Sequence, residues 1–341
     1  MRIALDGMGG DLAPHVVLQG ALNAAQTGAF DVVLVGQRAV LEPLLAVHRP
    51  LPPNLHLEDA PDVVAMDDHP GAAVRQKPRS SIGVGVSLVK TGAADAFVSA
   101  GNTGAVMAFG VLSLGRLPGV ERPALTSVFP TVHGCCLILD VGANADCRAS
   151  QLLQFGVMGA AYMQSALGVT NPRVGLLSIG EEATKGNQLT LEAHQLLKQS
   201  GLNFIGNVEG KDIPAGLADV VVTDGFSGNV AIKVAEGVSE AVVSLIRSAV
   251  TSRWYFKAAA VVLRPAFRSV AKRMDYAEYG GAPLLGVRGV IIIGHGRSNA
   301  RAIARALEVA AQAVEGRVVD TIARGVAAVP APAASPTLEP A

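Results

Sequence analysis

The stretch DVVVTDGFSGNV, residues 219–230, contains the unit that recurs along this chain: an apolar strand, a glycine turn and the start of a helix. Residues 95–106, DAFVSAGNTGAV, match it at both glycines, both hydroxyl positions and the final valine. Similar strand-type runs precede helix-length segments in IALDG, DVVLVG, CLILDVG, VGLLSIG and GVIIIGHG. Because strands separated by helices must cross over, they pair in parallel. The sequence therefore predicts an α/β fold: a doubly wound sandwich with a mostly parallel sheet covered on both faces.

The composition allows a large core and gives the chain no net charge. Half of the 341 residues are hydrophobic and 16% are charged, so the chain is neither disordered nor fibrous. Lys and Arg together number 28, as do Asp and Glu. No global field therefore attracts nucleic acid, and an anionic partner must meet a local cationic patch.

We expect a cytoplasmic protein without a membrane span. The opening MRIALDG resembles a buried strand and lacks the features of a secretory signal. The apolar runs stop well short of the roughly 18 residues that cross a bilayer. Cys135, Cys136 and Cys147 form neither a metal-ligand spacing nor an even disulfide set, which favours a reducing compartment.

The chain is expected to form one α/β domain over residues 1–326. A helix pair at about residues 236–275 is expected as an insertion, and the Ala- and Pro-rich residues 327–341 are expected to be a flexible tail. Residues 51–61 and 66–82 are expected to be connecting loops, and loops of that length are commonly functional.

Four strand-to-helix turns are rich in glycine: residues 6–11, 99–106, 223–230 and 294–300. Glycine lets the backbone approach a ligand, Ser or Thr adds a donor, and the following helix start offers free N–H groups. Ordinary helix capping explains any one such turn equally well. Four together favour an anion-binding rim.

Dinucleotide, nucleoside triphosphate and metal sites are disfavoured. No turn has a full GxGxxG with an acidic residue about 20 positions on, and no GxxxxGK[ST] loop is present. Asp6, Asp11 and Asp140 come from separate segments without ligand spacing. We assign no metal.

Taken in order, the motifs from residue 1 to about residue 316 resemble those of the fatty acyl-acyl carrier protein:phosphate acyltransferase family. Gly7 is a departure, since many members are expected to have Ala there, and the tail after Arg324 lies outside the resemblance. The motifs are IALDGMGGDLAP, VSAGNTGAVMA, LDVGANADC, SIGEEATKGNQL, NFIGNVEGKDI, VVVTDGFSGNVAIK and GAPLLGVRGVIIIGHGRSNARAI.

The resemblance implies a cytoplasmic homodimer whose fold is related to phosphotransacetylases and the isopropylmalate dehydrogenase group. It implies Rossmann-like α/β subunits and no metal or organic cofactor. The implied substrates are acyl carrier protein thioester and inorganic phosphate, and the acyl phosphate product would pass to a membrane glycerol-3-phosphate acyltransferase in phospholipid synthesis.

This reaction needs positioning and oxyanion stabilisation more than a covalent nucleophile, because phosphate is nucleophilic and a thiolate leaves readily. The absence of a GxSxG elbow agrees with that expectation. We therefore expect direct attack of phosphate on the thioester without an acyl-enzyme.

Lys185 is the first choice for holding phosphate or stabilising the oxyanion, with a solvated loop lysine as the competing interpretation. Asp224 would repel phosphate, so we expect it to orient Lys185 or to take a proton from dihydrogen phosphate. Of Glu181 and Glu182, one is expected to pair with Lys185 and the other to be exposed.

The remaining candidates lie in the glycine turns. His295 and Arg297 suit phosphate or the phosphodiester of a phosphopantetheine arm, and a histidine hydrogen-bonded within its turn is an equal alternative. The catalytic candidates are Lys185, Asp224, Asn229 and Asn102, and the phosphate- or acyl-binding candidates are Gly7, Gly9, Gly10, Gly101, Thr103, Gly225, Ser227, Gly228, His295, Arg297 and Ser298.

Residues 253–273, RWYFKAAAVVLRPAFRSVAKR, contain no acidic residue. At helical period five cations fall on one side, next to apolar surface, and Pro265 predicts two helices joined near residues 263–265. The segment is either a dimer interface with solvated cations or a surface for anionic lipid or acidic carrier protein, and the two are compatible. The five cations are Arg253, Lys257, Arg264, Arg268 and Lys272.

Two other functions stay open. A short-chain phosphotransacetylase that uses coenzyme A shares the reaction type. A non-catalytic membrane-docking subunit of lipid synthesis is suggested by the cationic helix pair.

Overall fold

The computed structural model describes residues 1–274 and 280–329, with the side chains of residues 267–274 excepted. Its centre is an 11-stranded sheet. The strands are β1 Arg2–Asp6, β2 Asp31–Gly36, β3 Leu55–Asp59, β4 Ala96–Ser99, β5 Ala124–Thr131, β6 Gly134–Leu139, β7 Val174–Leu177, β8 Phe204–Val208, β9 Val220–Val222, β10 Ala282–Leu285 and β11 Val290–Ile293.

Two blocks of parallel strands run in opposite directions within this sheet. The first block has the order β3-β2-β1-β4-β11, and the second has the order β6-β9-β7-β8. Between them, β10 pairs antiparallel with β11 and with β5, and β5 pairs antiparallel with β6. These three reversals in succession make the carboxyl ends of the two blocks point opposite ways.

The central strands contribute to two separate hydrophobic cores, because successive side chains point to opposite faces of a sheet. Ile3 and Leu5 of β1 enter one core and Ala4 enters the other. Along β11, Ile292 joins the first core and Ile291 the second. Burial on both faces explains why the strands are continuous apolar runs in the sequence.

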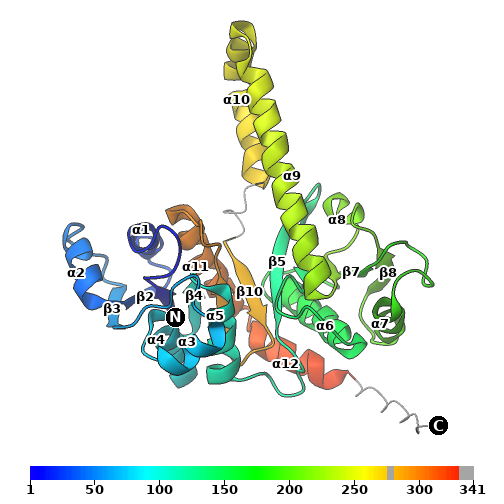
Figure 1. The fold of residues 1–341 in the computed structure, drawn as a ribbon, viewed down its shortest axis with the longest axis horizontal. Coiled ribbons are helices and arrows are strands. Elements are labelled where there is room, and N and C mark those ends of the chain that lie inside the picture. Colours follow the sequence, from blue (N-terminus) through cyan, green and yellow to red (C-terminus); the bar gives the residue numbers. More distant parts are fainter. Residues whose placement is uncertain (275–279, 330–341) are drawn as a thin grey trace.

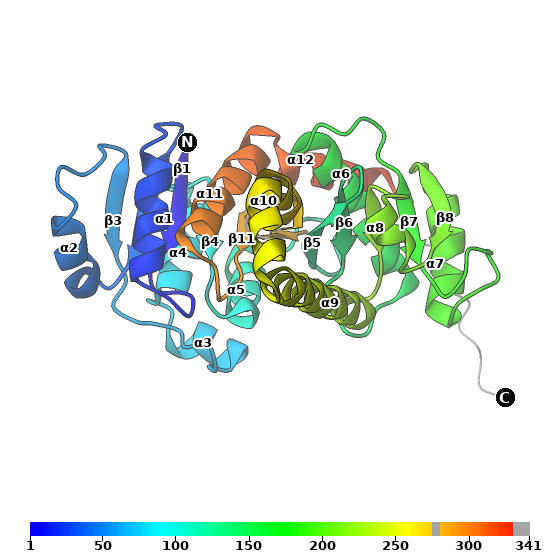
Figure 2. The ribbon, with the colours of Figure 1, turned by 90° about the horizontal axis from the view of Figure 1, so that it is seen from above.

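Helices close both cores, which makes the molecule a three-layer sandwich (Figure 2). The first core lies under α1 (His15–Ala25), α2 (Arg38–Ala46), α6 (Ala149–Ser165), α7 (Gln188–Lys198), α11 (Ala300–Glu315) and α12 (Val318–Ala328). The second lies under α3 (Pro70–Gln76), α4 (Ser81–Thr91), α5 (Thr103–Phe109) and α8 (Asp212–Ala215).

The predicted α/β class is confirmed, and a strand forms in each of the seven expected runs. Four further strands, β3, β5, β8 and β10, were not anticipated. Residues 51–61, expected to be a loop, contain β3, and residues 66–82 contain α3 and the start of α4. β3 is an edge strand with polar residues between its leucines, and both β5 and β10 contain proline, so all three lack the apolar pattern of a central strand.

The expected helix pair is present as α9 (Gly225–Thr251) and α10 (Trp254–Met274), which lie side by side and project from the body of the molecule (Figure 1). The expected junction near residues 263–265 is wrong: the chain reverses between α9 and α10, and Pro265 lies inside α10. Pro265 is exposed, so water can solvate the carbonyl that the proline leaves without a helical partner.

The C-terminal helix α12 extends to Ala328, so the first residues of the expected tail are helical. Residues 330–341 of that tail lie outside the described residues. Within the described chain, every helix is too short or too polar to cross a bilayer.

Candidate active site

Three of the four glycine turns meet at the carboxyl ends of β1, β4 and β11. The Asp11 N–H donates to the Gly296 carbonyl at 2.8 Å, and the Gly294 N–H donates to the Ser99 carbonyl at 2.8 Å. A Cβ on Gly9 would lie 2.7 Å from the Gly101 nitrogen, which is too close for any side chain, so the two turns can approach this closely only with glycine at position 9. We call residues 6–11, 99–104 and 294–298 the glycine-turn cluster.

Asp6 holds the first turn of this cluster from beneath. Its carboxylate is buried and accepts hydrogen bonds from the Ser99 hydroxyl at 2.7 Å and the Met8 N–H at 3.1 Å. Burial raises the pKa of Asp6, and its hydrogen-bond donors oppose that rise. Asp6 therefore shapes the turn from inside the protein. Gly7, Gly9 and Gly10 all lie in this turn, and Gly10 has a φ of +111°, which favours glycine.

Asn102 is buried and already uses both ends of its amide. Its Nδ2 donates to the carbonyls of Ala65 at 3.2 Å, Met66 at 3.0 Å and Asp68 at 2.9 Å. Its Oδ1 accepts from the Ala105 N–H at 3.0 Å, which caps α5. The structure thus places Asn102 as a helix cap and loop tether, whereas Thr103 beside it is exposed.

The third turn carries the predicted imidazole and guanidinium. The Arg297 N–H donates to His295 Nδ1 at 3.1 Å, and the buried Ser298 donates its N–H to the His295 carbonyl at 2.9 Å. Partial burial lowers the pKa of His295, and the nearby Lys233 ammonium lowers it further. At neutral pH this favours a neutral ring, in which Nδ1 accepts and Nε2 carries the proton.

The fourth turn, residues 223–230, packs elsewhere, against the loop after β6. The Gly225 N–H donates to the Asn144 carbonyl at 2.8 Å, and a Cβ on Gly228 would overlap the Asp140 carbonyl. Asp224 Oδ1 accepts from the Ser227 N–H at 2.8 Å, so Asp224 is the N-cap of α9. Asn229 is exposed next to Gly142.

In the second block, the buried carboxylate of Asp140 accepts hydrogen bonds from a neighbouring turn, as that of Asp6 does in the first block. Its buried carboxylate accepts from the backbone N–H groups of Leu125 at 3.0 Å, Ala143 at 3.2 Å and Asn144 at 2.6 Å. The Asn144 Nδ2 adds a fourth bond at 2.9 Å. Burial raises the pKa of Asp140, opposed by these donors. A buried carboxylate thus shapes the loop beside the fourth glycine turn as well.

Lys185 lies in an exposed loop after β7, residues 178–187, which we call the Lys185 loop. Since β9 pairs in parallel with both β6 and β7, this loop and the Asp224 turn follow neighbouring strands at one edge of the sheet. Across the side chains that the structure describes, no hydrogen bond or ion pair joins Asp224 to Lys185. The observed role of Asp224 is therefore the cap of α9.

Helix α9 connects the two groups of turns. It begins in the fourth turn at Gly225, and farther along Glu240 lies 3.6 Å from the Arg297 guanidinium of the glycine-turn cluster. The charges of Lys233 and Glu236 reach His295 from the same helix. The single anion-binding rim that the sequence predicts is therefore divided. The glycine-turn cluster lies in the first block, the turn at residues 223–230 lies in the second, and α9 extends between them.

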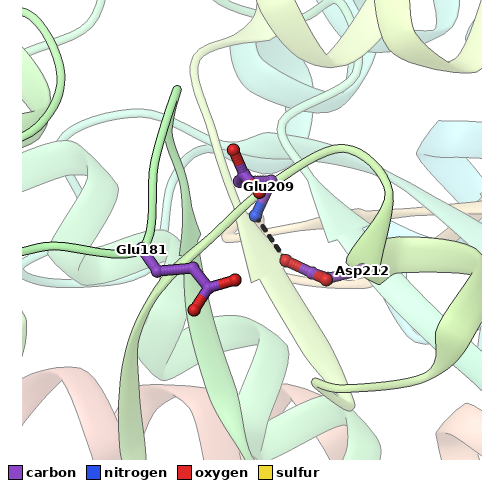
Figure 3. A group of neighbouring side chains, drawn as sticks. All are labelled: Glu181, Glu209 and Asp212. Carbon is purple, nitrogen blue, oxygen red and sulfur yellow. Dashed lines mark hydrogen bonds between the residues drawn. The ribbon is translucent and has the colours of Figure 1, made fainter.

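An acidic cluster of Glu181, Glu209 and Asp212 lies near the Lys185 loop (Figure 3). Lys211 forms ion pairs with Glu209 and, at 3.7 Å, with Glu181. The Asp212 carboxylate accepts the Glu209 N–H at 2.8 Å. Because an ammonium already compensates these carboxylates, we assign no metal to the cluster. The exposed Glu181 pairs with Lys211, and among the described side chains neither Glu181 nor Glu182 forms an ion pair with Lys185.

The predicted cations Arg253, Lys257 and Arg264 are exposed on the helix pair, whereas the side chains of Arg268 and Lys272 lie outside the described residues. Trp254 is 79% exposed where α9 gives way to α10. Sequence reasoning missed a second apolar surface on α9, although the four-residue spacing of its valines signals it. The exposed valines are Val230, Val234, Val238 and Val242.

Sequence reasoning also missed two buried polar residues behind the Lys185 loop. His194 of α7 and Asn207 of β8 are 7% and 6% exposed, and their side chains lie 2.9 Å apart. A histidine among the leucines of α7 and an asparagine inside a strand are the available signals.

Residues 1–321 match the family described as fatty acid synthesis protein. The phosphate acyltransferase of Desulfitobacterium hafniense (strain DSM 10664 / DCB-2) is 50% identical over 323 residues, which cover 94% of this chain and 96% of that protein. The phosphate acyltransferase of Desulforudis audaxviator is 49% identical over 326 residues, 96% of each chain. That of Myxococcus xanthus is 50% identical over 329 residues, 95% of this chain and 93% of its own.

Solved structures with a similar fold are more distant in sequence. A phosphotransacetylase from Streptococcus pyogenes has a TM-score of 0.64 at 18% identity, and the match covers 92% of this chain and 94% of that one. A 4-hydroxythreonine-4-phosphate dehydrogenase from Klebsiella pneumoniae has a TM-score of 0.56 at 13% identity, covering 92% and 99%. At these identities the likeness concerns the fold alone, and it agrees with the expected phosphotransacetylase-like architecture.

Proposed function

This chain belongs to the phosphate acyltransferase family and is an acyltransferase, and we propose that it transfers a fatty acyl group from acyl carrier protein to inorganic phosphate. The observation that carries the proposal is that both parallel blocks have glycine turns, three that meet in the first block and one in the second. The proposed reaction has two anionic groups to hold, the attacking phosphate and the phosphodiester of the carrier's phosphopantetheine arm. Glycine turns at helix starts suit both.

We assign the attacking phosphate to the second group, near Lys185 and Asn229. Lys185 is exposed on its loop, and Asn229 is exposed in the first turns of α9, so both are accessible to a ligand. The phosphodiester is assigned to the glycine-turn cluster, where His295, Arg297 and Thr103 are exposed. A neutral imidazole with a proton on Nε2 is a hydrogen-bond donor to a phosphodiester oxygen.

In the proposed step, a phosphate oxygen attacks the thioester carbonyl and forms a tetrahedral oxyanion. Lys185 and nearby backbone N–H groups stabilise that charge. Collapse of the intermediate breaks the carbon–sulfur bond, and the pantetheine thiolate leaves. The proton lost from hydrogen phosphate then belongs to the thiol product, so the products are acyl phosphate and free carrier thiol.

The cysteines support direct attack without an acyl-enzyme. Burial raises the pKa of Cys136 to about 12 and that of Cys147 to about 11. At neutral pH both are protonated thiols, which are poor nucleophiles. The attacking atom is therefore assigned to phosphate itself.

The helix pair is proposed to bind the enzyme to the membrane surface, where its product would be used. Exposed Arg253, Lys257 and Arg264, together with the aromatic residues at the junction of α9 and α10, suit an anionic membrane surface. There the acyl phosphate would reach a membrane acyltransferase that acylates glycerol 3-phosphate in phospholipid synthesis. We further propose a homodimer formed through the exposed apolar side of α9.

Trapping with hydroxylamine tests the proposed reaction. Because hydroxylamine also attacks thioesters directly, the readout is the excess over that background. Purified enzyme, palmitoyl-acyl carrier protein and phosphate should yield more palmitoyl hydroxamate than the same mixture without phosphate or without enzyme. Acetyl-coenzyme A with phosphate should give little product, because the proposal requires a long acyl chain and a carrier. Product from acetyl-coenzyme A alone would replace the proposal with a short-chain phosphotransacetylase, and no product from either thioester would leave a non-catalytic role.

A further inference from the structure

The backbone of the Lys185 loop is hydrogen-bonded to neighbouring residues, although residues 181–185 are all exposed. The Lys185 N–H donates to the Glu182 carbonyl at 3.0 Å and closes a turn. The Lys185 carbonyl accepts from the Ser178 hydroxyl at 3.1 Å. Asn207 Nδ2 donates to the Glu182 carbonyl at 2.8 Å and to the Lys185 carbonyl at 3.5 Å. Both ends of the turn are thereby tied to the body of the protein.

Asn207 is in turn oriented by His194. Its Nδ2 is committed to the two loop carbonyls, so its Oδ1 must accept the bond from His194 Nδ1, which lies 2.9 Å away. His194 therefore carries a proton on Nδ1. The imidazole packs edge-on against Phe204, with ring centroids 5.1 Å apart, and this contact fixes the ring plane.

Burial of a polar side chain costs free energy unless its polar atoms are hydrogen-bonded. His194 and Asn207 are both more than nine-tenths buried, and the bonds that Asn207 Nδ2 donates all go to the Lys185 loop. A solvated surface lysine needs no such support. We infer that His194 and Asn207 are positioning residues, which hold the loop so that the Lys185 ammonium is fixed where the phosphate and oxyanion gather. The inference rests on the proposed function for the role of Lys185.

The substitution Asn207→Asp tests the tether with little change in shape. An aspartate keeps an oxygen toward His194 but places a second oxygen against the carbonyls of Glu182 and Lys185, which repel it. Amide hydrogen exchange in residues 182–187 should become faster, and trypsin should cut after Lys185 sooner, as followed by mass spectrometry. With the loop displaced, kcat should fall about 10- to 100-fold. Unchanged exchange in this loop would overturn the inference.

Two substitutions of His194 separate positioning from stability. His194→Phe keeps the ring contact with Phe204 but removes the donor to Asn207. His194→Asn loses the ring and leaves a cavity, yet it retains an N–H donor near the position of Nδ1. The asparagine variant should melt at the lower temperature but keep the higher kcat and the slower loop exchange. If kcat instead follows melting temperature across the two variants, the residues are only structural.

The final comparison uses Lys185→Ala as background. If Asn207 acts through Lys185, Asn207→Asp should lower kcat in the native background but change it little in Lys185→Ala. Equal effects in both backgrounds would contradict the inference. Thr126→Val is the matched control, since it removes the buried hydrogen bond that Thr126 of β5 donates to the Pro283 carbonyl of β10 and should leave kcat and loop exchange unchanged.

The loop measurements require no turnover, so the inference and the proposed function fail separately. A wild-type enzyme that makes no acyl phosphate would overturn the proposed function and leave the tether to be judged by exchange and proteolysis. A loop that loosens in Asn207→Asp while kcat stays unchanged would overturn the catalytic part of the inference alone.

Discussion

Asp6 is the last residue of β1 and Asp140 directly follows β6, the strands that come first in the sequence within their parallel blocks. Burial raises the pKa of both carboxyls, and hydrogen bonds from the neighbouring turns offset the cost of keeping them charged. Their donors are the Ser99 hydroxyl on one side and Asn144 on the other. Carboxylates used in this way look the same in a sequence as carboxylates that ligate a metal, and the donors distinguish the two.

Substitutions of Asp224 should separate its cap from any role in proton transfer. Asp224→Ala removes the acceptor for the Ser227 N–H and should lower the free energy of unfolding by about 1 kcal/mol, whereas Asp224→Asn should change it little. Urea unfolding followed by circular dichroism measures both. Equal losses would contradict the cap. Turnover of Asp224→Asn that matches wild type at every pH would remove the proposed proton acceptor.

The ion pair of Arg173 with Asp219 should make stability depend on acid. The two side chains meet at 2.8 and 3.1 Å, and the guanidinium lowers the pKa of Asp219 below its usual 3.8. The stabilisation is therefore complete above that value and is lost as pH falls through the lower folded pKa. Because Arg173 is about half exposed, Asp219→Asn should cost about 1 kcal/mol at pH 7.

The difference between Asp219→Asn and wild type should shrink as pH falls below 3.8, since a protonated aspartate and an asparagine are then alike. Thermal unfolding at several pH values measures it. A difference that grows toward low pH would show that another group accounts for the effect.

At the scale of elements, the helix pair presents two different surfaces. Val230, Val234 and Val238 are exposed on α9 at four-residue spacing, and the described cations Lys257 and Arg264 are exposed on α10. Residues four apart are neighbours on a helix, so the valines form a continuous apolar strip. An apolar strip suits a protein partner, and exposed cations suit an anionic surface.

Charge reversal on the helix pair should weaken contact with anionic membranes. The double variant Arg253→Glu, Arg264→Glu should bind phosphatidylglycerol vesicles at least about tenfold more weakly than wild type in sedimentation, with a larger difference at low salt. Lys90→Glu, Lys198→Glu is the matched control, because it reverses two exposed charges on α4 and α7. Equal vesicle binding by both double variants and wild type would remove the membrane role.

At the scale of the whole molecule, the antiparallel strands β10 and β5 determine where the glycine turns lie. They reverse direction between the parallel blocks, so the turns after β1, β4 and β11 meet and the turn after β9 does not join them. Helix α9 then links the two groups through Glu240 and Arg297. The two proposed substrates, phosphate and the acyl carrier protein thioester, each bring one anionic group, which matches this division.

Polar substitutions on the apolar strip of α9 should dissociate the proposed dimer. Val234 and Val238 are 59% and 57% exposed, and Val234→Glu, Val238→Glu should raise the dimer Kd about 100-fold, equivalent to about 2.8 kcal/mol. Sedimentation velocity over a concentration series measures the change. Leu112→Glu is the control, an exposed apolar residue on another element. A dimer that persists in the double variant would place the interface elsewhere.

Much of this architecture was predictable, because central strands and amphipathic helices are local patterns. All seven strand-type runs form strands, since burial on both faces requires unbroken apolar residues. The strands β10 and β5 were not predictable, because each contains a proline and pairs antiparallel with the other between the two parallel blocks. The prediction of a helix boundary at Pro265 was wrong because this residue is exposed to water, and α10 continues through it.

The features of the candidate site were also predictable only in part. Glycine turns, helix starts, the Lys185 loop and the ordered family motifs are properties of neighbouring residues, and the linear chain determines them. Contacts between residues distant in the chain depend on strand order and direction, which no local pattern encodes. For that reason the fold alone determined that three turns meet without the fourth, that Asn102 tethers residues 65–68, and that His194 and Asn207 stand behind Lys185.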